Sequence, residues 1–125
     1  MKVIIAGSRN IPWGMLTMNV ALAMAQARRE GIVPTEIVSG HAIGVDQAGE
    51  AWAEVAGLPV KLFPVTSEMW EREGKAAGPN RNRRMAEYAD ALVAIWDGKS
   101  RGTESMIRFA REKGLKVHVH TVRTP

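Results

Sequence analysis

Short apolar runs alternate with helix-periodic segments along this chain. The run at 2–6 ("KVIIA") is rich in β-branched residues and ends at Gly7, which is typical of a strand buried on both faces. The next segment repeats apolar residues every three or four positions, which predicts a helix between Pro12 and Gly31. The alternation continues, and predicts strands at 36–40, 59–65, 91–96 and 115–122 and helices at 45–56, 68–72, 79–88 and 103–113.

Strands that alternate with helices imply right-handed crossovers and a mostly parallel sheet covered by helices on both faces. The pattern therefore predicts an α/β fold, a single Rossmann-like three-layer sandwich with five strands, over residues 1–125. In such sheets ligands bind beyond the carboxyl ends of the strands, so unusual polar residues are expected there.

Composition narrows the class of protein. The 125 residues suit one domain, and the absence of cysteine excludes disulfides, thiolate catalysis and cysteine-ligated metal. The apolar run at 3–6 is too short for a signal peptide, and no run approaches the roughly 20 apolar residues of a membrane span. We expect a cytoplasmic protein with no membrane partner.

Positive charge is focused on one segment. The net charge of +4 and the pI near 9.9 permit nucleic-acid binding without requiring it. Residues 75–84 hold four cations and no acid, whereas 68–73 hold three acids and one arginine. Two readings stay open: a solvated helix face, or a segment that binds an anion.

Three loops at the predicted strand ends combine glycine with hydroxyl or charged residues: "GSR" at 7–9, "SGHAIGVD" at 39–46 and "DGKSRGT" at 97–103. Glycine lets backbone N–H groups approach a ligand closely, and helix N-termini favour anions. Together the loops predict a cradle for phosphate and ribose. Gly7 as a tight turn, and Asp46 and Thr103 as helix-start residues, are the structural alternatives. Neither a P-loop nor a G-x-G-x-x-G fingerprint is present.

Other candidates for chemistry are weaker. His118 and His120 share one face of the last strand, but no third ligand is evident, so we predict no metal and no cofactor. Trp13 and Trp70 could stack on a base, although packing is the simpler reading.

Several stretches resemble the YspA-like branch of the SLOG superfamily, which is named for Smf/DprA and LOG proteins. They are "IIAGSR", "IVSGHAIGVD" and "GKAAGPNRNRRMAEYADALVAIWDGKSRGT", and with the tail they cover nearly the whole chain in order. The resemblance implies a Rossmann-like fold with a pocket for nucleotides or nucleotide-derived ligands. Some members bind ADP-ribose-type or cyclic signals, some hydrolyse nucleotide N-glycosidic bonds, and the DprA branch binds single-stranded DNA.

The sequence also departs from the pattern of the family. Where the branch usually reads G-G-A-R-G-V-D, His41 replaces a glycine and Ile43 replaces an arginine. The LOG phosphoribohydrolases carry an arginine four residues before a methionine, then G-G-x-G-T-x-x-E. Arg81 and Met85 match the first part, and Gly102 and Thr103 match the glycine and threonine of the second. The glutamate position holds Met106, while Glu104 stands next to Thr103. A carboxylate would stabilise the oxocarbenium-like state of hydrolysis, so the resemblance supports binding more than turnover.

The expected site follows from the loops and the resemblance together. We expect Arg81 and Asn82 to hold a phosphate, Gly102 and Thr103 to bind a second one, and Lys75 to close over the ligand from a mobile lid at 66–78. If the protein is an enzyme, the candidate catalytic residues are Arg81, Asp97 and Glu104. The full set of expected ligand-binding residues is Gly7, Ser8, Arg9, Ser39, Gly40, Gly44, Asp46, Lys75, Gly78, Arg81, Asn82, Asp97, Gly98, Gly102 and Thr103.

Three functions compete. The first is a sensor or sequestering protein for a nucleotide-derived small molecule, of the ADP-ribose, NAD or cyclic-nucleotide type. The second is a LOG-like hydrolase of nucleotide N-glycosidic bonds. Single-stranded nucleic-acid binding ranks third, because no aromatic residues are interleaved with the basic segment. A homodimer stays open, through the apolar faces at 16–24 or 106–109, unless these faces simply cover the sheet.

Overall fold

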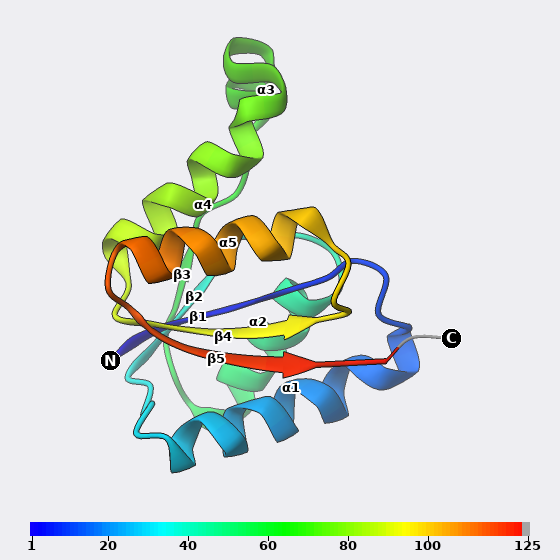
Figure 1. Ribbon diagram of the computed structural model, residues 1–125, viewed down its shortest axis with the longest axis vertical. Coiled ribbons are helices and arrows are strands. Elements are labelled where there is room, and N and C mark those ends of the chain that lie inside the picture. The colour runs from blue at the N-terminus through cyan, green and yellow to red at the C-terminus, as the bar shows by residue number, and fades with distance from the viewer. Residues whose placement is uncertain (124–125) are drawn as a thin grey trace.

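A single parallel sheet forms the centre of the computed structural model, which describes residues 1–123 (Figure 1). The strand order is β3-β2-β1-β4-β5, and every neighbouring pair is parallel. The predicted Rossmann-like three-layer α/β sandwich is therefore confirmed. The strands are β1 (Lys2–Gly7), β2 (Glu36–Ser39), β3 (Val60–Leu62), β4 (Ala91–Trp96) and β5 (Lys116–Thr121).

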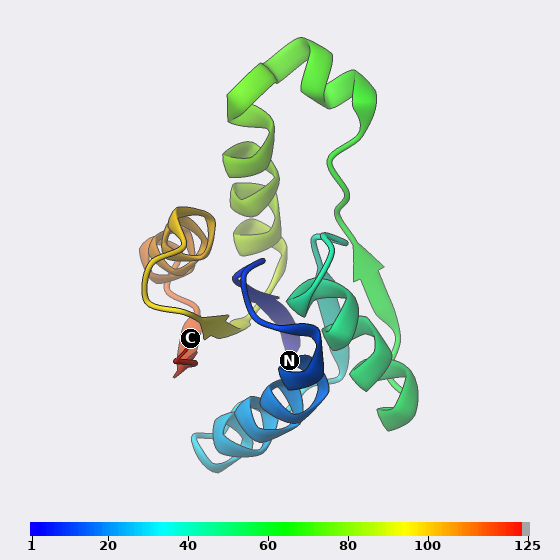
Figure 2. The same cartoon turned by 90° about the vertical axis from the view of Figure 1, so that its right-hand side faces the viewer.

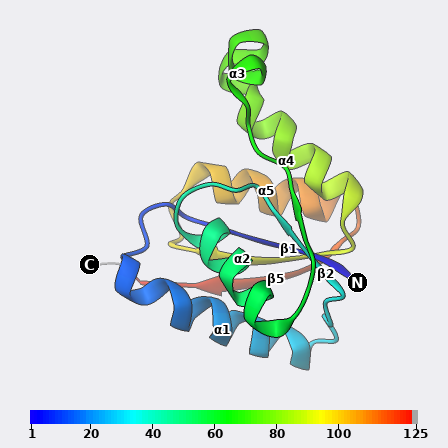
Figure 3. The ribbon, with the colours of Figure 1, turned by 180° about the vertical axis from the view of Figure 1, so that it is seen from behind.

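Helices cover both faces of the sheet (Figure 3). On one face lie α1 (Trp13–Arg29) and α2 (Val45–Ala56), and on the other lie α4 (Ala77–Tyr88) and α5 (Arg101–Glu112). A short helix α3 (Ser67–Glu73) and a 3₁₀ turn η1 (Gly74–Ala76) precede α4. The third strand is shorter than the predicted 59–65. Its last ladder bond runs from the Phe63 N–H to the Ser39 carbonyl oxygen, and Pro64 then has no N–H to offer.

The core consists of two apolar layers, one on each face of the sheet, as the alternating residues of β1 show. Val3 and Ile5 point into the layer under α1 and α2, and Ile4 and Ala6 point into the layer under α4 and α5. All four are buried, which explains why the strand reads as a continuous apolar run rather than an alternating one.

The apolar helix faces considered for a homodimer are occupied within the chain. Leu16 and Val20 of α1 belong to one core layer, and Met106 and Phe109 of α5 belong to the other. These faces therefore cover the sheet, which is the alternative to a homodimer interface given in the sequence analysis.

The segment before α4 forms a projecting arm, defined here as α3 and η1 (residues 67–76). Figures 1 and 2 show it extending away from the sheet and its flanking helices. No residue of the arm is buried, and Trp70 is 59% exposed. The predicted helix at 79–88 begins at Ala77 instead and follows η1 directly. Its N-terminus therefore adjoins the arm, and Gly78 and Pro79 lie inside its first turn.

Candidate functional site

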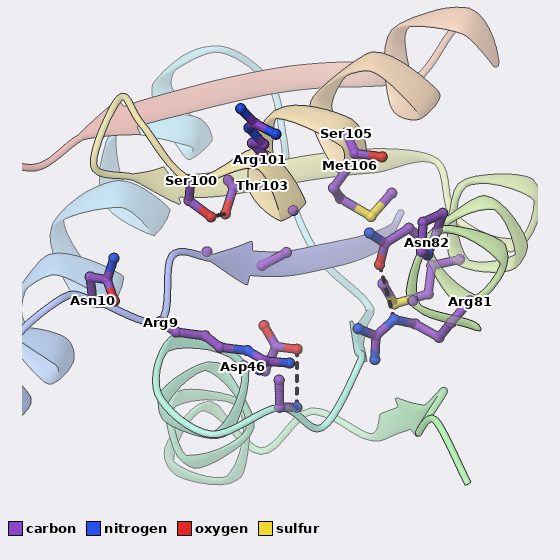
Figure 4. Close-up of a pocket in the computed structure, with 17 residues that line it drawn as sticks. Arg9, Asn10, Asp46, Arg81, Asn82, Ser100, Arg101, Thr103, Ser105 and Met106 are labelled. Atoms are coloured by element: carbon purple, nitrogen blue, oxygen red, sulfur yellow. Dashed lines mark hydrogen bonds between the residues drawn. The ribbon is translucent and has the colours of Figure 1, made fainter. Parts of the chain in front are cut away.

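A cleft of about 530 Å³ lies at the carboxyl ends of β1 and β4 (Figure 4). These two central strands are the topological switch point of the sheet: the chain leaves β1 toward α1 on one face and leaves β4 toward α5 on the other. Gly7 closes β1 at the cleft. A Cβ there would lie 2.4 Å from the Ile95 carbonyl oxygen, so only glycine fits between the strands.

The N-terminus of α5 opens onto the cleft. Its N-cap, Ser100, makes no side-chain capping bond. Among residues 1–123, no acceptor is hydrogen-bonded to the backbone N–H groups of Arg101, Gly102 and Thr103. All four residues line the cleft. Free N–H groups at a helix N-terminus, with the helix dipole behind them, form a site for an anion.

Asp97 shapes the loop that leads into α5. Its Oδ1 accepts the backbone N–H of Lys99 at 2.9 Å and of Ser100 at 2.8 Å, and the Ser8 hydroxyl at 3.2 Å. The hydrogen bonds from the Ser100 and Lys99 N–H groups lower the pKa of Asp97, and the Ser8 hydroxyl adds to this. Asp97 does not line the cleft, so its placement is that of a loop-forming carboxylate.

One face of α4 forms another wall, through Gly78, Arg81, Asn82 and Met85, which follow the i, i+3, i+4, i+7 spacing of a helix face. Arg81 is held in place by the chain itself. Its Nη1 donates to the Gly40 carbonyl oxygen at 2.6 Å and to that of Phe63 at 3.3 Å.

The remaining contacts of Arg81 fix its orientation. Its Nε donates to the Asn82 Oδ1 at 2.9 Å, while Nη2 has no partner among the described residues. Burial lowers the pKa of Arg81 and Asp46 opposes this, but a guanidinium stays cationic in proteins. A Cβ on Gly40 would lie 2.5 Å from Nη1, so the arginine position requires glycine at 40.

Asp46 is the buried carboxylate of the cleft, only 6% exposed, in the first turn of α2. Burial raises the pKa of Asp46 to about 6. The Ala42 N–H, which donates to Oδ2 at 3.2 Å, and the charges of Arg81 and Arg9 lower the pKa and so oppose part of this rise. Figure 4 shows Arg9 and Asp46 on one side of β1 and Arg101 and Thr103 on the other. The cleft thus combines Arg9, Arg81 and Arg101 with one carboxylate.

The second loop is held by its own polar contacts. Glu50 accepts the Ser39 hydroxyl at 2.7 Å and lies 2.9 Å from the His41 Nδ1. His41 has a φ of 60°, the left-handed region that favours glycine, at the position where the resembled branch carries one. His41 therefore adopts a backbone conformation that a glycine at this position would reach without strain.

The structure brings together eight of the expected site residues in the cleft wall. They are Gly7, Arg9, Asp46, Gly78, Arg81, Asn82, Gly102 and Thr103. Others lie outside it: Ser8, Ser39, Gly40, Gly44, Lys75, Asp97 and Gly98. Lys75 belongs to the arm, and Glu104 lies in a neighbouring depression. Closure of a lid over the ligand stays a prediction.

Sequence reasoning missed several cleft residues, which are Ala6, Asn10, Ala42, Pro79, Met85, Ser100, Arg101, Ser105 and Met106. Two signals could have found some of them. Arg101 lies in the same glycine-rich loop as the residues that were chosen, and Met85 completes the helical spacing from Gly78.

The histidines of β5 face α1. The His118 Nε2 and the His120 Nδ1 lie 3.0 and 3.2 Å from the Gln26 Oε1, and the His118 Nδ1 lies 2.5 Å from a Glu30 oxygen. Burial, and then the charge of His118, lower the pKa of His120. Within residues 1–123, no group of three or more metal-binding side chains occurs. None of the described helices has the length and apolar character to cross a membrane.

Fold and site together define a Rossmann-like domain with an arginine-lined cleft at the switch point of its sheet. The fold is similar to that of a solved structure, DNA processing protein A (DprA) from Streptococcus pneumoniae, with a TM-score of 0.70 and 23% sequence identity. The match covers 94% of this chain and 49% of that one, so this chain spans about half the length of that protein. At this identity the likeness shows a shared fold. No protein-family model and no curated protein sequence matches the chain.

Proposed function

We propose that this protein binds a nucleotide or nucleotide-derived ligand, such as an ADP-ribose-type, NAD-related or cyclic nucleotide, in the cleft. The observation that carries the proposal is the α5 N-terminus, where the N–H groups of Arg101, Gly102 and Thr103 have no partner within residues 1–123. They lie at a cleft that contains three arginines. A phosphate group satisfies these donors and complements the positive charge.

The remainder of the cleft suits the uncharged part of such a ligand. Ala6, Met85 and Met106 supply apolar surface, and Asn10 and Asn82 supply amide groups that can bind ribose hydroxyls or base edges. The resemblance of the three loops to the SLOG superfamily supports the same class of ligand. The fold likeness to DprA is compatible with it.

Binding without turnover is the favoured form of the proposal. Met106 is buried and lines the cleft at the position where LOG phosphoribohydrolases carry their glutamate. A thioether cannot stabilise an oxocarbenium-like state or activate water as a carboxylate does. The protein then acts as a sensor or sequestering protein.

The test combines a thermal-shift screen with recovery of each ligand for mass analysis. Candidate ligands are nucleoside monophosphates, NAD, ADP-ribose and cyclic nucleotides. A ligand at about 100 times its dissociation constant adds roughly 2.7 kcal/mol to the free energy of unfolding, which raises Tm by several degrees. Arg101→Ala should remove the shift, while Arg111→Ala, a control on the same helix but outside the cleft, should keep it. The absence of any shift would contradict the proposal.

One observation favours a second function, hydrolysis of a nucleotide N-glycosidic bond. Asp46 is the carboxylate among the cleft residues, and its pKa of about 6 lies near the range of a general acid or base. This function predicts free base and ribose phosphate in the recovered sample, and their loss in Asp46→Asn. If Asp46→Asn still forms the products but Asp97→Asn or Glu104→Gln does not, the catalytic residues are those expected from the sequence rather than Asp46.

Single-stranded nucleic acid is a third candidate ligand, and the fold likeness to a DNA processing protein favours testing it. Affinity that rises with oligonucleotide length and falls steeply with salt would support it. Equal affinity for a mononucleotide and a long oligonucleotide would favour the small-molecule function.

A further inference from the structure

A second, smaller depression of about 300 Å³ adjoins the cleft along α5. It is lined by Arg101, Glu104, Ser105 and Arg108, and it shares Arg101 and Ser105 with the cleft. These residues follow one face of the helix at the i, i+3, i+4, i+7 spacing. A ligand held at the α5 N-terminus can therefore extend into the depression along one continuous wall.

Arg108, which lines this depression, and Arg83 of α4 hold their guanidinium groups against the same aromatic ring. The Arg108 group lies 5.5 Å from the centre of the Phe109 ring, and the Arg83 group from α4 lies 5.0 Å from the same centre. A contact with an aromatic face orients a guanidinium but leaves its charge in place.

Arg83, Arg101 and Arg108 take part in none of the ion pairs formed within residues 1–123. Like charges that share one ring repel each other, and an anion placed beside them relieves the repulsion.

We propose that Arg108, with Arg101, forms a subsite for a second anionic group, so that the ligand is a nucleotide with two separated phosphates. The inference rests on the proposed function. Seven residues of helix separate Arg101 from Arg108, a rise of about 10 Å. Helix side chains tilt toward the N-terminus, which brings the Arg108 guanidinium closer to the first phosphate. The two anionic groups of the ligand are therefore expected to lie on the order of 10 Å apart.

Glu104 determines how strongly the subsite attracts an anion. Its exposed carboxylate lines the depression between the two arginines and opposes a second phosphate. Replacing it with glutamine keeps the size of the side chain and removes the charge. The subsite therefore predicts that Glu104→Gln binds the second phosphate more tightly, whereas the loss of a catalytic carboxylate would appear as lost turnover.

The experiment is isothermal titration of the protein with two probes, AMP and adenosine 3′,5′-bisphosphate. The wild type should bind the bisphosphate at least about tenfold more tightly than AMP. Arg108→Ala should weaken the bisphosphate about tenfold and AMP less than twofold. Arg111→Ala, an exposed arginine on the same helix outside both hollows, is the matched control and should change neither affinity.

The outcomes separate the subsite from the proposed function. If the wild type binds AMP and the bisphosphate equally, or if Arg108→Ala behaves like Arg111→Ala, the subsite is wrong and the cleft proposal stands. If the wild type binds neither probe, the subsite is wrong, and if it also binds no ligand of the thermal-shift screen, the cleft proposal fails with it. A bisphosphate affinity that rises in Glu104→Gln and falls in Arg108→Ala supports the subsite.

Discussion

Asp46→Asn gives the sharpest test of the electrostatics of the cleft. Asp46 is a buried carboxylate whose Oδ2 accepts the Ala42 N–H at 3.2 Å. Asparagine has nearly the same shape, and its amide oxygen can accept the same hydrogen bond. The substitution therefore removes the charge while the local contacts remain.

The magnitude follows from the pKa of Asp46, which burial raises from 3.8 to about 6. The difference corresponds to roughly 3 kcal/mol between the two protonation states of the folded protein. Because the pKa is raised on folding, the folded state binds more protons between these two values. Below about pH 4 the Asp46 carboxyl is protonated in both states and does not lower the free energy of unfolding. As the pH rises from about 4 through 6, the free energy of unfolding falls, because the unfolded state loses the proton first.

The assay is urea unfolding of the wild type and Asp46→Asn at several pH values from 4 to 8. The difference in unfolding free energy between the two proteins isolates Asp46, because every other group titrates in both. We expect near-equal stability at pH 4 and a variant more stable by up to about 3 kcal/mol at pH 7 and above. A difference that stays constant with pH, or an asparagine variant that is less stable at pH 7, would refute this reasoning.

Three further substitutions test how the loops around the cleft are held. Arg81→Ala leaves the carbonyl oxygens of Gly40 and Phe63 without their donor, so it should lower the unfolding free energy by about 2–4 kcal/mol in urea titrations as well as weaken ligand binding. Gly40→Ala places a Cβ 2.5 Å from the Arg81 Nη1, so ligand affinity should fall even where Tm changes little; unchanged affinity would count against the assigned role of Arg81. His41→Gly should keep Tm within a few degrees of the wild type, whereas His41→Val should lose about 1–2 kcal/mol because valine resists a φ of 60°. Equal stability of the glycine and valine variants would show that His41 is not held in that conformation.

The fold could be predicted from the sequence because its signals are local. The apolar run at 2–6 and the periodic segment after Pro12 reflect one buried strand and one amphipathic helix, and neither depends on distant residues. The end of β3 was harder to predict from the sequence, because the effect of Pro64 depends on where the hydrogen-bond ladder with β2 stops. The start of α4 was missed because helical structure continues from the arm into it without a side-chain N-cap.

The sequence predicted which loops form the site, but it did not predict the direction in which each side chain points. That Gly7, Asp46 and Thr103 lie at one edge follows from parallel strands alone. That Asp97 turns back onto its own loop, and that Glu104 points away from the cleft, depends on the exact turn before α5. No spacing rule in the sequence fixes that turn.

The most direct test of the central claim is an NMR titration of ¹⁵N-labelled protein with ADP-ribose. We expect the largest amide shift changes at Gly102 and Thr103, whose N–H groups would meet the phosphate, and smaller changes at Ala42 beside Asp46. Amides far from the cleft, such as that of Gly57 at the end of α2, should not move. Shifts confined to the arm around Trp70, or none at saturating ligand, would contradict the placement of the binding site.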